Sequence, residues 1–468
     1  MQNTAQVGAL EGTLSALRAE LRSQPVLAGT DVPPRNSKDW NNLPQFPLAV
    51  VRPLNAIEVA EVVLACRKLG LPFVAQGGMT GLCGGAVAAP GWVAISLERM
   101  VGIEEVDRAA GTMTVAAGTA LETVQNAADE AGLFFPLDVG SRGSCSIGGN
   151  LSTNAGGNRV IRYGMARDLV LGVEVVLPDG TIITSLNKLL KNNAGYDLKQ
   201  LFIGSEGTLG IITRAVLRLF PKPRSNTVAL CRLADYQSVV ALLHSARDSL
   251  GPQLSAFEVM WSDFWTANTT FGGVRPPLAD GPGYFVLVEA QGTDEVVDRP
   301  RFEAWLGGVM DSGLVADATL AQSLAQVQHL WAAREAAELG KAIGPRSNYD
   351  IGLPLARMDE FASICKATLS AEIPGCESIY FGHIADGNLH LVAWMPGQSL
   401  ETQPKCTIDR IVYGLVRKMD GSISAEHGIG TSKKQWLGHA RSEQEIALMR
   451  KLKAALDPDN LLNPGKIL

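Results

Sequence analysis

The spacing of apolar and polar positions divides the chain into segments with different periodicities. Near the N-terminus, Leu10, Leu14, Leu17 and Leu21 recur at steps of four and three. This stripe predicts an amphipathic helix that packs on a later part of the chain. From Leu48 onward, short β-branched runs alternate with helical patterns, and the simplest interpretation is strand, helix, strand.

The first half of the chain contains several runs that are typical of strands. They are LAVVRP, LPFVAQGG, GWVAISL, GTMTVAAG, LVLGVEVVLPDG and LGIITRAVLRLFPKP, and the helical pattern NAIEVAEVVLACRKLG separates the first two. Asp179-Gly180 is a turn signal within the fifth run. We therefore expect an N-terminal helical segment at residues 1–38 and a first domain at residues 39–223.

A second region repeats the alternation of strand and helix, in VALCRL, YQSVVALLHSARDSL and YFVLVEAQG. This order predicts an α+β domain at residues 224–410. A helical pattern from Ile408 to Met419 then opens a C-terminal helical segment at residues 411–468. Its Pro/Asn punctuation, in LDPDNLLNPGKIL, predicts a tail that packs back on the first domain.

The length and bulk composition fit a soluble globular enzyme of two domains, or of one domain with a large insertion. The chain has 468 residues, of which 46% are hydrophobic and 19% are charged, and its formal net charge is −6. Without a basic run, nucleic acid is not an expected partner. The sequence also lacks an apolar stretch long enough for a bilayer helix and an N-terminal signal-peptide pattern, so we expect no membrane span and a cytoplasmic location.

The seven cysteines are odd in number and widely scattered, and none forms a C-x-x-C pair. We expect reduced thiols in the core. The same spacing excludes a built-in iron–sulfur cluster, which needs several closely spaced thiolates. Electrons from any redox reaction must therefore leave for an external acceptor.

Two small-residue loops are candidates for binding a dinucleotide. The segment from Gln76 to Pro90 places five glycines within nine positions after a strand, and the segment from Pro136 to Gly164 adds polar residues such as Asn150. Backbone N–H groups of such loops can point into one concavity and bind a diphosphate. Either loop alone is equally typical of a flexible connection.

A third segment, FIGSEGTLGIIT, carries Glu206, whose carboxylate could accept a hydrogen bond from ribose or adenine. None of the three segments matches G-x-G-x-x-G at the start of a helix or a Walker A loop. The sequence therefore supports neither a Rossmann NAD site nor a P-loop.

The segment YFGHIADGNLHLVAW predicts a metal-binding hairpin. Asp386-Gly387 is a two-residue turn signal, and counting outward from it places His383 opposite His390, with Asn388 on the same face. Ile384 and Leu389 would then face a core. Two neutral imidazoles suit zinc, although a purely structural histidine pair is the alternative.

A further acidic residue could complete such a site. SISAEHGIG offers Glu426 as the third ligand, with His427 beside it. Three of the six histidines of the chain thus fall within two motifs, which favours a metal centre over a structural pair.

In their order, the motifs GGMTGL, IGGN…NAGG, GSEGTLGIIT, the two histidine motifs and NPGK resemble those of the FAD-linked D-2-hydroxyacid dehydrogenases. The resemblance covers residues 39–468 and includes bacterial D-2-hydroxyglutarate and D-lactate dehydrogenases. It implies an α+β chain with a vanillyl-alcohol-oxidase (PCMH-type) FAD-binding domain, a substrate/cap domain and a C-terminal segment that returns to the flavin. The residues expected to contact FAD are Gly77, Gly78, Thr80, Gly81, Leu82, Pro136, Asp138, Gly140, Ser144, Gly148, Gly149, Asn150, Asn154, Gly156, Gly157, Gly164, Glu206, Gly210, Ile211 and Asn463.

The resemblance also implies roles for the side chains around the hairpin. It implies that His383, His390 and Glu426 ligate a divalent metal, for which zinc is expected. It implies that the catalytic group comprises His427 as the general base, Arg334 as the clamp for the substrate C1 carboxylate, and Asn388. For Arg334 the alternative is a solvated helix residue.

We expect the FAD to be non-covalent. Some relatives attach it through a histidine of the FAD domain, but here no histidine precedes His244. Cys145 lies close to where certain relatives carry a cysteinyl link, but the surrounding GSCSIGG does not match their motif.

The chemistry explains why these residue types are needed together. A metal that binds the substrate 2-hydroxyl lowers the pKa of that hydroxyl. A histidine then accepts the hydroxyl proton, and hydride passes from C2 to flavin N5. We expect a D-2-hydroxy acid as the substrate and an electron-transfer flavoprotein or a quinone as the acceptor, with a homodimer as one possible assembly. An oxidase that uses O₂ and a non-catalytic flavin-binding subunit of a glycolate-oxidising complex are the alternatives.

Two positions depart from the hydroxyglutarate pattern. Asn348 stands where relatives place a lysine for the distal carboxylate, and Glu338 replaces a hydroxyl-bearing residue one turn after Arg334. Losing a cation and gaining an anion disfavours a second substrate carboxylate, although Arg346 could substitute for the lysine. D-Lactate or another monocarboxylate is therefore an alternative to D-2-hydroxyglutarate.

Overall fold

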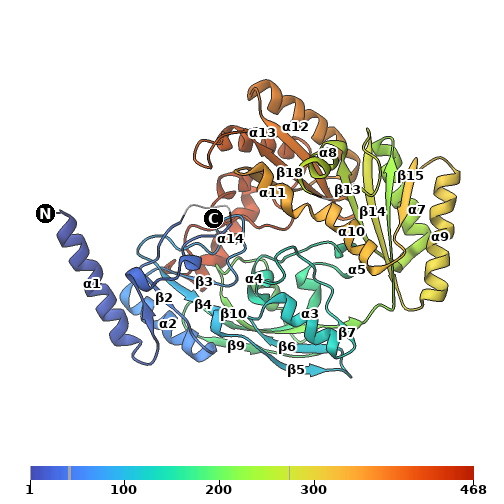
Figure 1. The fold of residues 1–468 in the computed structure, drawn as a ribbon. Helices are drawn as coiled ribbons and strands as arrows, with labels where there is room; N and C mark the ends of the chain where they lie inside the picture. The colour runs from blue at the N-terminus through green and yellow to red at the C-terminus, as the bar shows by residue number, and fades with distance from the viewer. Residues whose placement is uncertain (1, 41–43, 274) are drawn as a thin grey trace. The chain divides into compact units, whose positions relative to one another are not determined.

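The computed structural model describes residues 2–40, 44–273 and 275–468 (Figure 1). The chain divides into two compact units. The first unit comprises Met1–Gly156, Met165–Lys222 and Glu426–Leu468, and the second comprises Gly157–Gly164 and Pro223–Ala425. Each unit combines helices with sheets, as the α+β prediction requires.

The first unit contains a mixed sheet and an antiparallel sheet. In the mixed sheet the strand order is β1-β2-β4-β3, with β2 and β3 parallel to β4, and in the antiparallel sheet it is β5-β6-β10-β8-β9. The elements of this unit are α1 (Gln2–Glu20), β1 (Val26–Leu27), β2 (Ala49–Val51), α2 (Ala56–Leu69), β3 (Phe73–Gln76), β4 (Val93–Ser96), β5 (Ile103–Asp107), β6 (Thr112–Ala116), α3 (Leu121–Glu130), β7 (Leu133–Phe134), α4 (Ile147–Ser152), β8 (Val170–Val176), β9 (Ile182–Ser185), α6 (Lys199–Phe202), β10 (Ile211–Arg218), β11 (Phe220–Pro221) and α14 (Glu443–Leu456).

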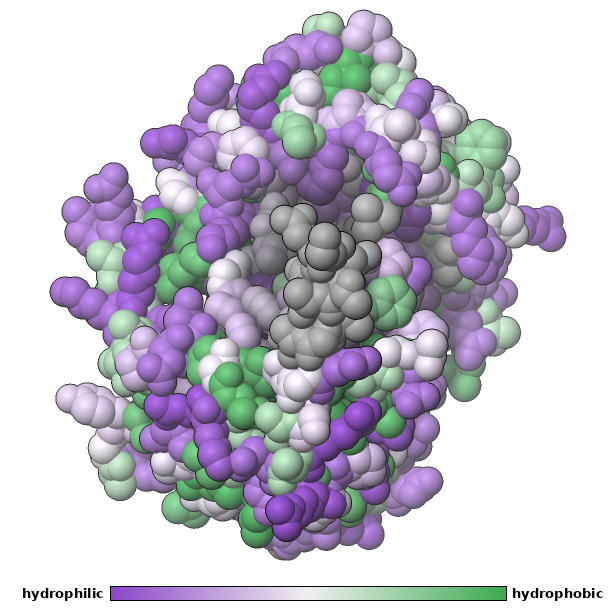
Figure 2. Space-filling view, turned by 90° about the vertical axis from the view of Figure 1, so that its left-hand side faces the viewer, coloured by the Kyte–Doolittle hydropathy of each residue, from purple (hydrophilic) through white to green (hydrophobic). Residues whose placement is uncertain are grey.

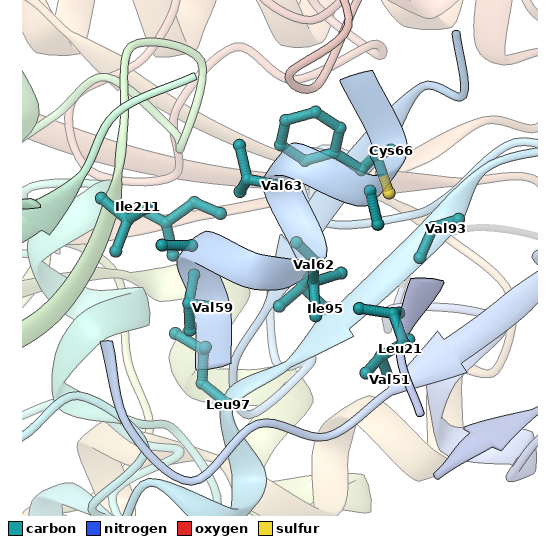
Figure 3. Close-up of a cluster of buried hydrophobic side chains, with 14 of the residues drawn as sticks. Leu21, Val51, Val59, Val62, Val63, Cys66, Val93, Ile95, Leu97 and Ile211 are labelled. Carbon is teal, nitrogen blue, oxygen red and sulfur yellow. The ribbon is translucent and has the colours of Figure 1, made fainter. Parts of the chain in front are cut away.

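Helix α2 shows how the sequence builds the core of the first unit. Asn55 caps its N-terminus by accepting a hydrogen bond from the backbone N–H of Glu58, and Gly70 ends it in the left-handed conformation. Between these caps, Val59, Val62 and neighbouring apolar residues face β2, β4 and Ile211, as Figure 3 shows. The predicted N-terminal stripe also contributes, because Leu17 and Leu21 of the α1 region are buried in this cluster.

The second unit is built around an antiparallel sheet with the strand order β15-β12-β14-β13-β17-β18-β16. Its elements are α5 (Val160–Tyr163), β12 (Ser225–Leu233), α7 (Tyr236–Leu250), β13 (Leu254–Trp261), α8 (Ser262–Phe271), β14 (Tyr284–Gly292), α9 (Glu295–Asp311), β15 (Asp317–Leu320), α10 (Leu324–Glu335), α11 (Ala337–Ile343), β16 (Ser347–Gly352), α12 (Met358–Glu372), β17 (Glu377–His383), β18 (Asn388–Trp394) and α13 (Lys405–Lys418). The core includes Trp265 stacked on Phe285, with ring centroids 4.1 Å apart.

The N-terminal segment, expected to stand apart at residues 1–38, belongs to the first unit. The unit boundaries also differ from the expected domain limits in two other places. Residues 157–164 belong to the second unit, where Arg159 forms an ion pair with buried Glu289. Helix α13 also belongs to the second unit, because its buried Asp409 accepts a hydrogen bond from Tyr349. The return to the first unit therefore begins at Glu426 rather than at residue 411.

The hairpin formed by β17 and β18 differs from its expected register. Phe381, not His383, is the partner of His390. The predicted two-residue turn is wrong because a 3-10 turn at Ile384–Asp386 lengthens the connection before Gly387, which has a φ of 86°. The pairing moves by two residues, and since side chains alternate with a period of two, both imidazoles keep the same face.

The face of the molecule shown in Figure 2 is mostly hydrophilic, as expected for a globular protein. Apolar residues lie in smaller groups between the hydrophilic side chains. Within the described part of the chain, no helix is both long and apolar enough to cross a bilayer. The cysteines are free, as expected, and most are buried, but the expectation that all lie in the core is wrong for exposed Cys406 and half-buried Cys376.

Candidate functional site

In the first unit, the two glycine-rich loops lie directly against each other. A Cβ atom placed on Gly78 would lie 2.1 Å from the carbonyl oxygen of Ser144 and 2.8 Å from Cα of Cys145. A Cβ on Gly77 would lie 2.3 Å from Oγ of Ser146. Only glycine permits this approach, so the two segments identified separately in the sequence form one structure.

Small residues are also required where the second loop continues into α4. Gly148 donates its N–H to the carbonyl of Ala117 at 2.7 Å, and a Cβ on Gly148 would lie 2.7 Å from Cβ of Ala117. Farther along, a Cβ on Gly156 would lie 2.7 Å from Oε1 of Glu426. The NAGG motif and the predicted metal ligand Glu426 are therefore neighbours within this unit.

The third segment is anchored by its glutamate. Glu206 is buried with a φ of 52°, and its two oxygens accept the N–H groups of Ile429 at 2.6 Å and Gly430 at 2.8 Å. Burial raises the pKa of Glu206, while these N–H groups and nearby Lys466 act in the opposite direction. A carboxylate oxygen can accept more than one hydrogen bond, so the expected contact with ribose or adenine stays a prediction.

The C-terminal tail ties these segments together. The side-chain amide of Asn463 donates to the carbonyls of Gly85 and Glu206, both at 2.9 Å. Lys466 donates to the carbonyls of Gly84 at 2.7 Å and Val87 at 2.8 Å. Burial lowers the pKa of Lys466 to about 8. The tail therefore fixes the backbone of the first glycine-rich loop.

In the second unit, β17 and β18 bring the two predicted imidazoles together. The ring centroids of His383 and His390 are 5.1 Å apart, and the planes meet edge to face at 84°. His383 is buried and His390 is partly buried. Ile384 and Leu389 are also buried, in agreement with the expected alternation of faces.

A buried carboxylate on the neighbouring strand links His383 to Arg334. Oε1 of Glu258 lies 2.6 Å from Nδ1 of His383, and Oε2 accepts from Nε of Arg334 at 2.8 Å and lies 2.7 Å from its Nη2. Burial alone would raise the pKa of Glu258, but the facing His383 and Arg334 outweigh it and hold that pKa below its usual value.

Arg334 is therefore not a solvated helix residue. It lies in the last turn of α10 with only 6% of its surface exposed, and its guanidinium carbon lies 4.8 Å from the ring centroid of Phe381. Asn388, at the start of β18, is also buried. Its amide nitrogen and oxygen both have no hydrogen-bond partner among the described residues. Such a buried, unsatisfied amide is costly unless a ligand completes it.

A second buried acid organises the chain just before Glu426. Asp350 of β16 is the cross-strand partner of His390, and its Oδ1 lies 3.9 Å from Nδ1 of that histidine. Its Oδ2 accepts the N–H of Ala425 at 3.0 Å and the hydroxyl of Ser424 at 3.3 Å. The Asp350 carboxylate thus fixes the backbone that leads into Glu426 and His427.

Comparisons with known proteins identify the family of this chain. A model described as "FAD binding domain" matches residues 47–185, and one described as "FAD linked oxidases, C-terminal domain" matches residues 222–467. The chain belongs to the FAD-linked oxidases. It is a flavin-dependent oxidoreductase, and FAD is its expected cofactor.

Three relatives are similar to this chain over most of its length. The D-2-hydroxyglutarate dehydrogenase of Xanthomonas citri is 41% identical over 92% of this chain and 91% of its own. The mitochondrial D-2-hydroxyglutarate dehydrogenase of Bos taurus is 37% identical over 98% and 84%. A putative mitochondrial D-lactate dehydrogenase of Schizosaccharomyces pombe is 37% identical over 89% and 81%.

Solved structures confirm the expected vanillyl-alcohol-oxidase (PCMH-type) fold. p-Cresol methylhydroxylase superposes with a TM-score of 0.77 at 16% identity, covering 98% of this chain and 97% of that one. 4-Ethylphenol oxidase from Gulosibacter chungangensis gives a TM-score of 0.74 at 17% identity, with coverage of 98% and 96%. At these identities the likeness concerns the fold alone.

Glu338, which departs from the hydroxyglutarate pattern, and Arg346, the candidate substitute for the missing lysine, both have partners within this FAD-linked oxidase. Glu338 is exposed and forms an ion pair with Lys341 at 2.7 Å. Nη1 of Arg346 donates to the carbonyls of Gly340 and Gly344. Arg346 thus closes the C-terminal end of α11, and burial lowers its pKa.

The sequence interpretation missed Glu258 and gave no role to Asp350. A usable signal existed for both, because each is an acid among mostly apolar neighbours, in AFEVMW and YDIGLP. Fully buried acids are rare unless they are paired or bind a metal. That rule would have marked both positions as candidates.

Proposed function

We propose that this FAD-linked oxidoreductase is a dehydrogenase that oxidises a small D-2-hydroxy acid to the 2-oxo acid at a divalent metal site. The names of the relatives support the substrate class, because one is a D-2-hydroxyglutarate dehydrogenase and another a putative D-lactate dehydrogenase. The observation that carries the proposal is the imidazole pair of His383 and His390, held between Glu258 and Asp350 next to buried Arg334.

The donor set fits a divalent metal such as zinc. Because the carboxylate of Glu258 accepts a hydrogen bond at Nδ1 of His383, Nε2 of that ring is left with a lone pair for a metal. Glu426 is the residue after Ala425, so its Cα lies about 3.8 Å beyond the backbone that Asp350 fixes. Two imidazoles and one carboxylate form a typical zinc set that leaves a position for substrate.

The loops of the first unit fit FAD. The backbones of the first and second glycine-rich loops meet at Gly78 with no room for a side chain. Backbone N–H groups of such small-residue loops can bind a diphosphate. The motif next to Cys145 gives no support for a covalent link, and we propose that the FAD is bound non-covalently.

The chain's own side chains supply binding and proton transfer in this proposal. Arg334 binds the substrate C1 carboxylate through its guanidinium, and the amide of Asn388 hydrogen-bonds the substrate. His427 accepts the hydroxyl proton at a ring nitrogen. Bound FAD would supply the hydride acceptor, and a bound divalent ion would lower the pKa of the substrate hydroxyl.

A monocarboxylate such as D-lactate is the second candidate for the substrate. Two observations favour it over D-2-hydroxyglutarate. Asn348 stands where a lysine would hold the distal carboxylate, and Nη1 of Arg346 already donates to the carbonyls of Gly340 and Gly344. A second substrate carboxylate would therefore lack that lysine and would have to share Arg346 with these carbonyls.

Anaerobic flavin bleaching tests both the proposed reaction and the choice between the two candidate substrates. Purified holoenzyme is mixed without oxygen with the D and L forms of lactate and 2-hydroxyglutarate, and absorbance at the flavin band is followed. Bleaching by a D acid and not by its L form is the expected result. If no D acid bleaches the flavin, the chain is a flavin-binding protein without this activity.

The electron acceptor is proposed to be an electron-transfer flavoprotein or a quinone. The test is turnover in air with the best D acid, with and without a soluble quinone analogue. Slow reoxidation in air and fast reoxidation with the quinone are expected. Stoichiometric hydrogen peroxide in air would identify an oxidase instead.

A further inference from the structure

Glu258 has no place in the reaction described so far, yet it touches two of the proposed participants. It lies in β13, is 1% exposed, and its two oxygens face different partners, His383 on one side and Arg334 on the other. We infer that Glu258 is a positioning residue that couples the metal-binding imidazole to the guanidinium that binds the substrate carboxylate. This inference rests on the proposed function.

The sheet places Glu258 directly beside His383. The two residues are direct cross-strand partners in the β13–β17 ladder. Cross-strand side chains on one face lie about 5 Å apart at Cβ, so the 2.6 Å contact between Oε1 and Nδ1 follows from the sheet. The contact fixes both the tautomer and the rotation of the ring, as carboxylate partners of metal-bound histidines do.

The second oxygen orients Arg334. Oε2 engages Nε and Nη2, which leaves Nη1 and the second hydrogen of Nη2 for another anion. The ring of Phe381 lies against the guanidinium carbon at 4.8 Å and limits its tilt.

The carboxylate of Glu258 therefore sets the distance between the imidazole of His383 and the guanidinium of Arg334. A 2-hydroxy acid carries its hydroxyl and its carboxylate on adjacent carbons, so the metal and the guanidinium must be held at a matching separation. A carboxylate satisfies both sides because each of its oxygens is an acceptor. An amide cannot, because it offers one acceptor and one donor, and a donor meets repulsion from Arg334 or from the Nδ1 hydrogen.

The alternative is that Glu258 only stabilises the fold as half of a buried ion pair. The second unit contains a matched case. Glu289 of β14 is 0% exposed, bonds Arg159 at 2.9 Å, and accepts from Ser255 at 2.8 Å and Trp331 at 3.2 Å. It is equally buried and also ion-paired, and its partners Arg159, Ser255 and Trp331 include neither imidazole of the pair. A stability role predicts the same behaviour for both glutamates, whereas a positioning role does not.

The test compares Glu258→Gln, Glu258→Asp and Glu289→Gln in the FAD-loaded protein. Each is stripped with a chelator, titrated with Zn²⁺ by isothermal calorimetry, and assayed for kcat, KM and thermal unfolding. For Glu258→Gln we expect the Zn²⁺ Kd to rise by about 10- to 100-fold and KM for the hydroxy acid to rise as well. Glu289→Gln is expected to unfold earlier while its Zn²⁺ Kd stays within twofold of wild type.

Glu258→Asp keeps the charge but shortens the side chain, and serves if Glu258→Gln does not fold. The shorter carboxylate can reach His383 or Arg334 but not both. We therefore expect either the Zn²⁺ Kd or KM to rise, while the other quantity stays near its wild-type value. Unchanged Kd and KM in the foldable Glu258 variants, or an equal rise of Kd in Glu289→Gln, would overturn the inference. Wild-type protein that fails to bind Zn²⁺ would instead show that the proposed metal site is wrong, and the inference falls with it.

Discussion

Replacing Gly78 by alanine tests whether the apposed glycine-rich loops form the FAD site. The new Cβ would lie 2.1 Å from the carbonyl oxygen of Ser144, whereas real Cβ atoms essentially never come within 3.0 Å of such an atom. The loops would have to separate by roughly 1 Å, and overpacking of this kind costs about 1–3 kcal/mol. If that strain falls on the FAD-competent arrangement, the FAD Kd rises by roughly five- to 150-fold.

The assay is calorimetric titration of the apoprotein with FAD, together with urea unfolding of the apoprotein. Gly81→Ala is the matched control for stability, because the nearest atom to its Cβ would be Oδ2 of Asp39 at 3.9 Å. We expect unchanged apoprotein stability for Gly81→Ala. A Gly78→Ala protein that unfolds like wild type and binds FAD with the wild-type Kd would refute the close approach of the loops or its role in FAD binding.

Further predictions concern the second histidine motif, the metal, the C-terminal lysine and the flavin linkage. His427→Ala should lower kcat by about 10²- to 10⁴-fold with the flavin retained, since its proposed role is proton transfer; steady-state kinetics and flavin absorbance check this, and wild-type turnover would exclude it as the base. Exhaustive chelation should abolish turnover and Zn²⁺ should restore it, so full activity after chelation would contradict the metal site. Lys466 has a folded pKa of about 8 against an ordinary 10.5, so the unfolded chain binds more protons between these values. In urea unfolding, the free energy of unfolding of wild type relative to Lys466→Met should therefore rise between pH 8 and 10.5, by at most about 3 kcal/mol. A fall in this difference would contradict the burial of a charged amine. Acid precipitation should release the FAD into the supernatant, and yellow colour kept in the pellet would show a covalent link.

Local patterns predicted the elements that carry the glycine-rich loops. The boundaries of α2 follow from Asn55 as N-cap and Gly70 as C-cap, and both are readable in the sequence. The turn at Asp179-Gly180 was predicted correctly, because Gly180 has a φ of 83° between the antiparallel strands β8 and β9. Such features depend on a few neighbouring residues and therefore need no knowledge of tertiary contacts.

Features that depend on distant contacts were predicted less well. The Asp386-Gly387 pair indicated a turn, but the 3-10 turn at Ile384–Asp386 shifted the register by two residues. The imidazole pair survived this error because an even shift keeps each side chain on its face. Strand β13 was not predicted, so the role of the Glu258 carboxylate was missed as well. Glu258 contacts His383 although the two residues are 125 positions apart in the sequence.

X-ray absorption at the zinc edge of Zn²⁺-loaded holoenzyme tests the central claim most directly. We predict two imidazole nitrogens at about 2.0–2.1 Å with oxygen in the remaining positions, and one imidazole fewer in His390→Gln. A spectrum without imidazole scattering, or one that His390→Gln leaves unchanged, would contradict a metal centre built on the two histidines of this hairpin.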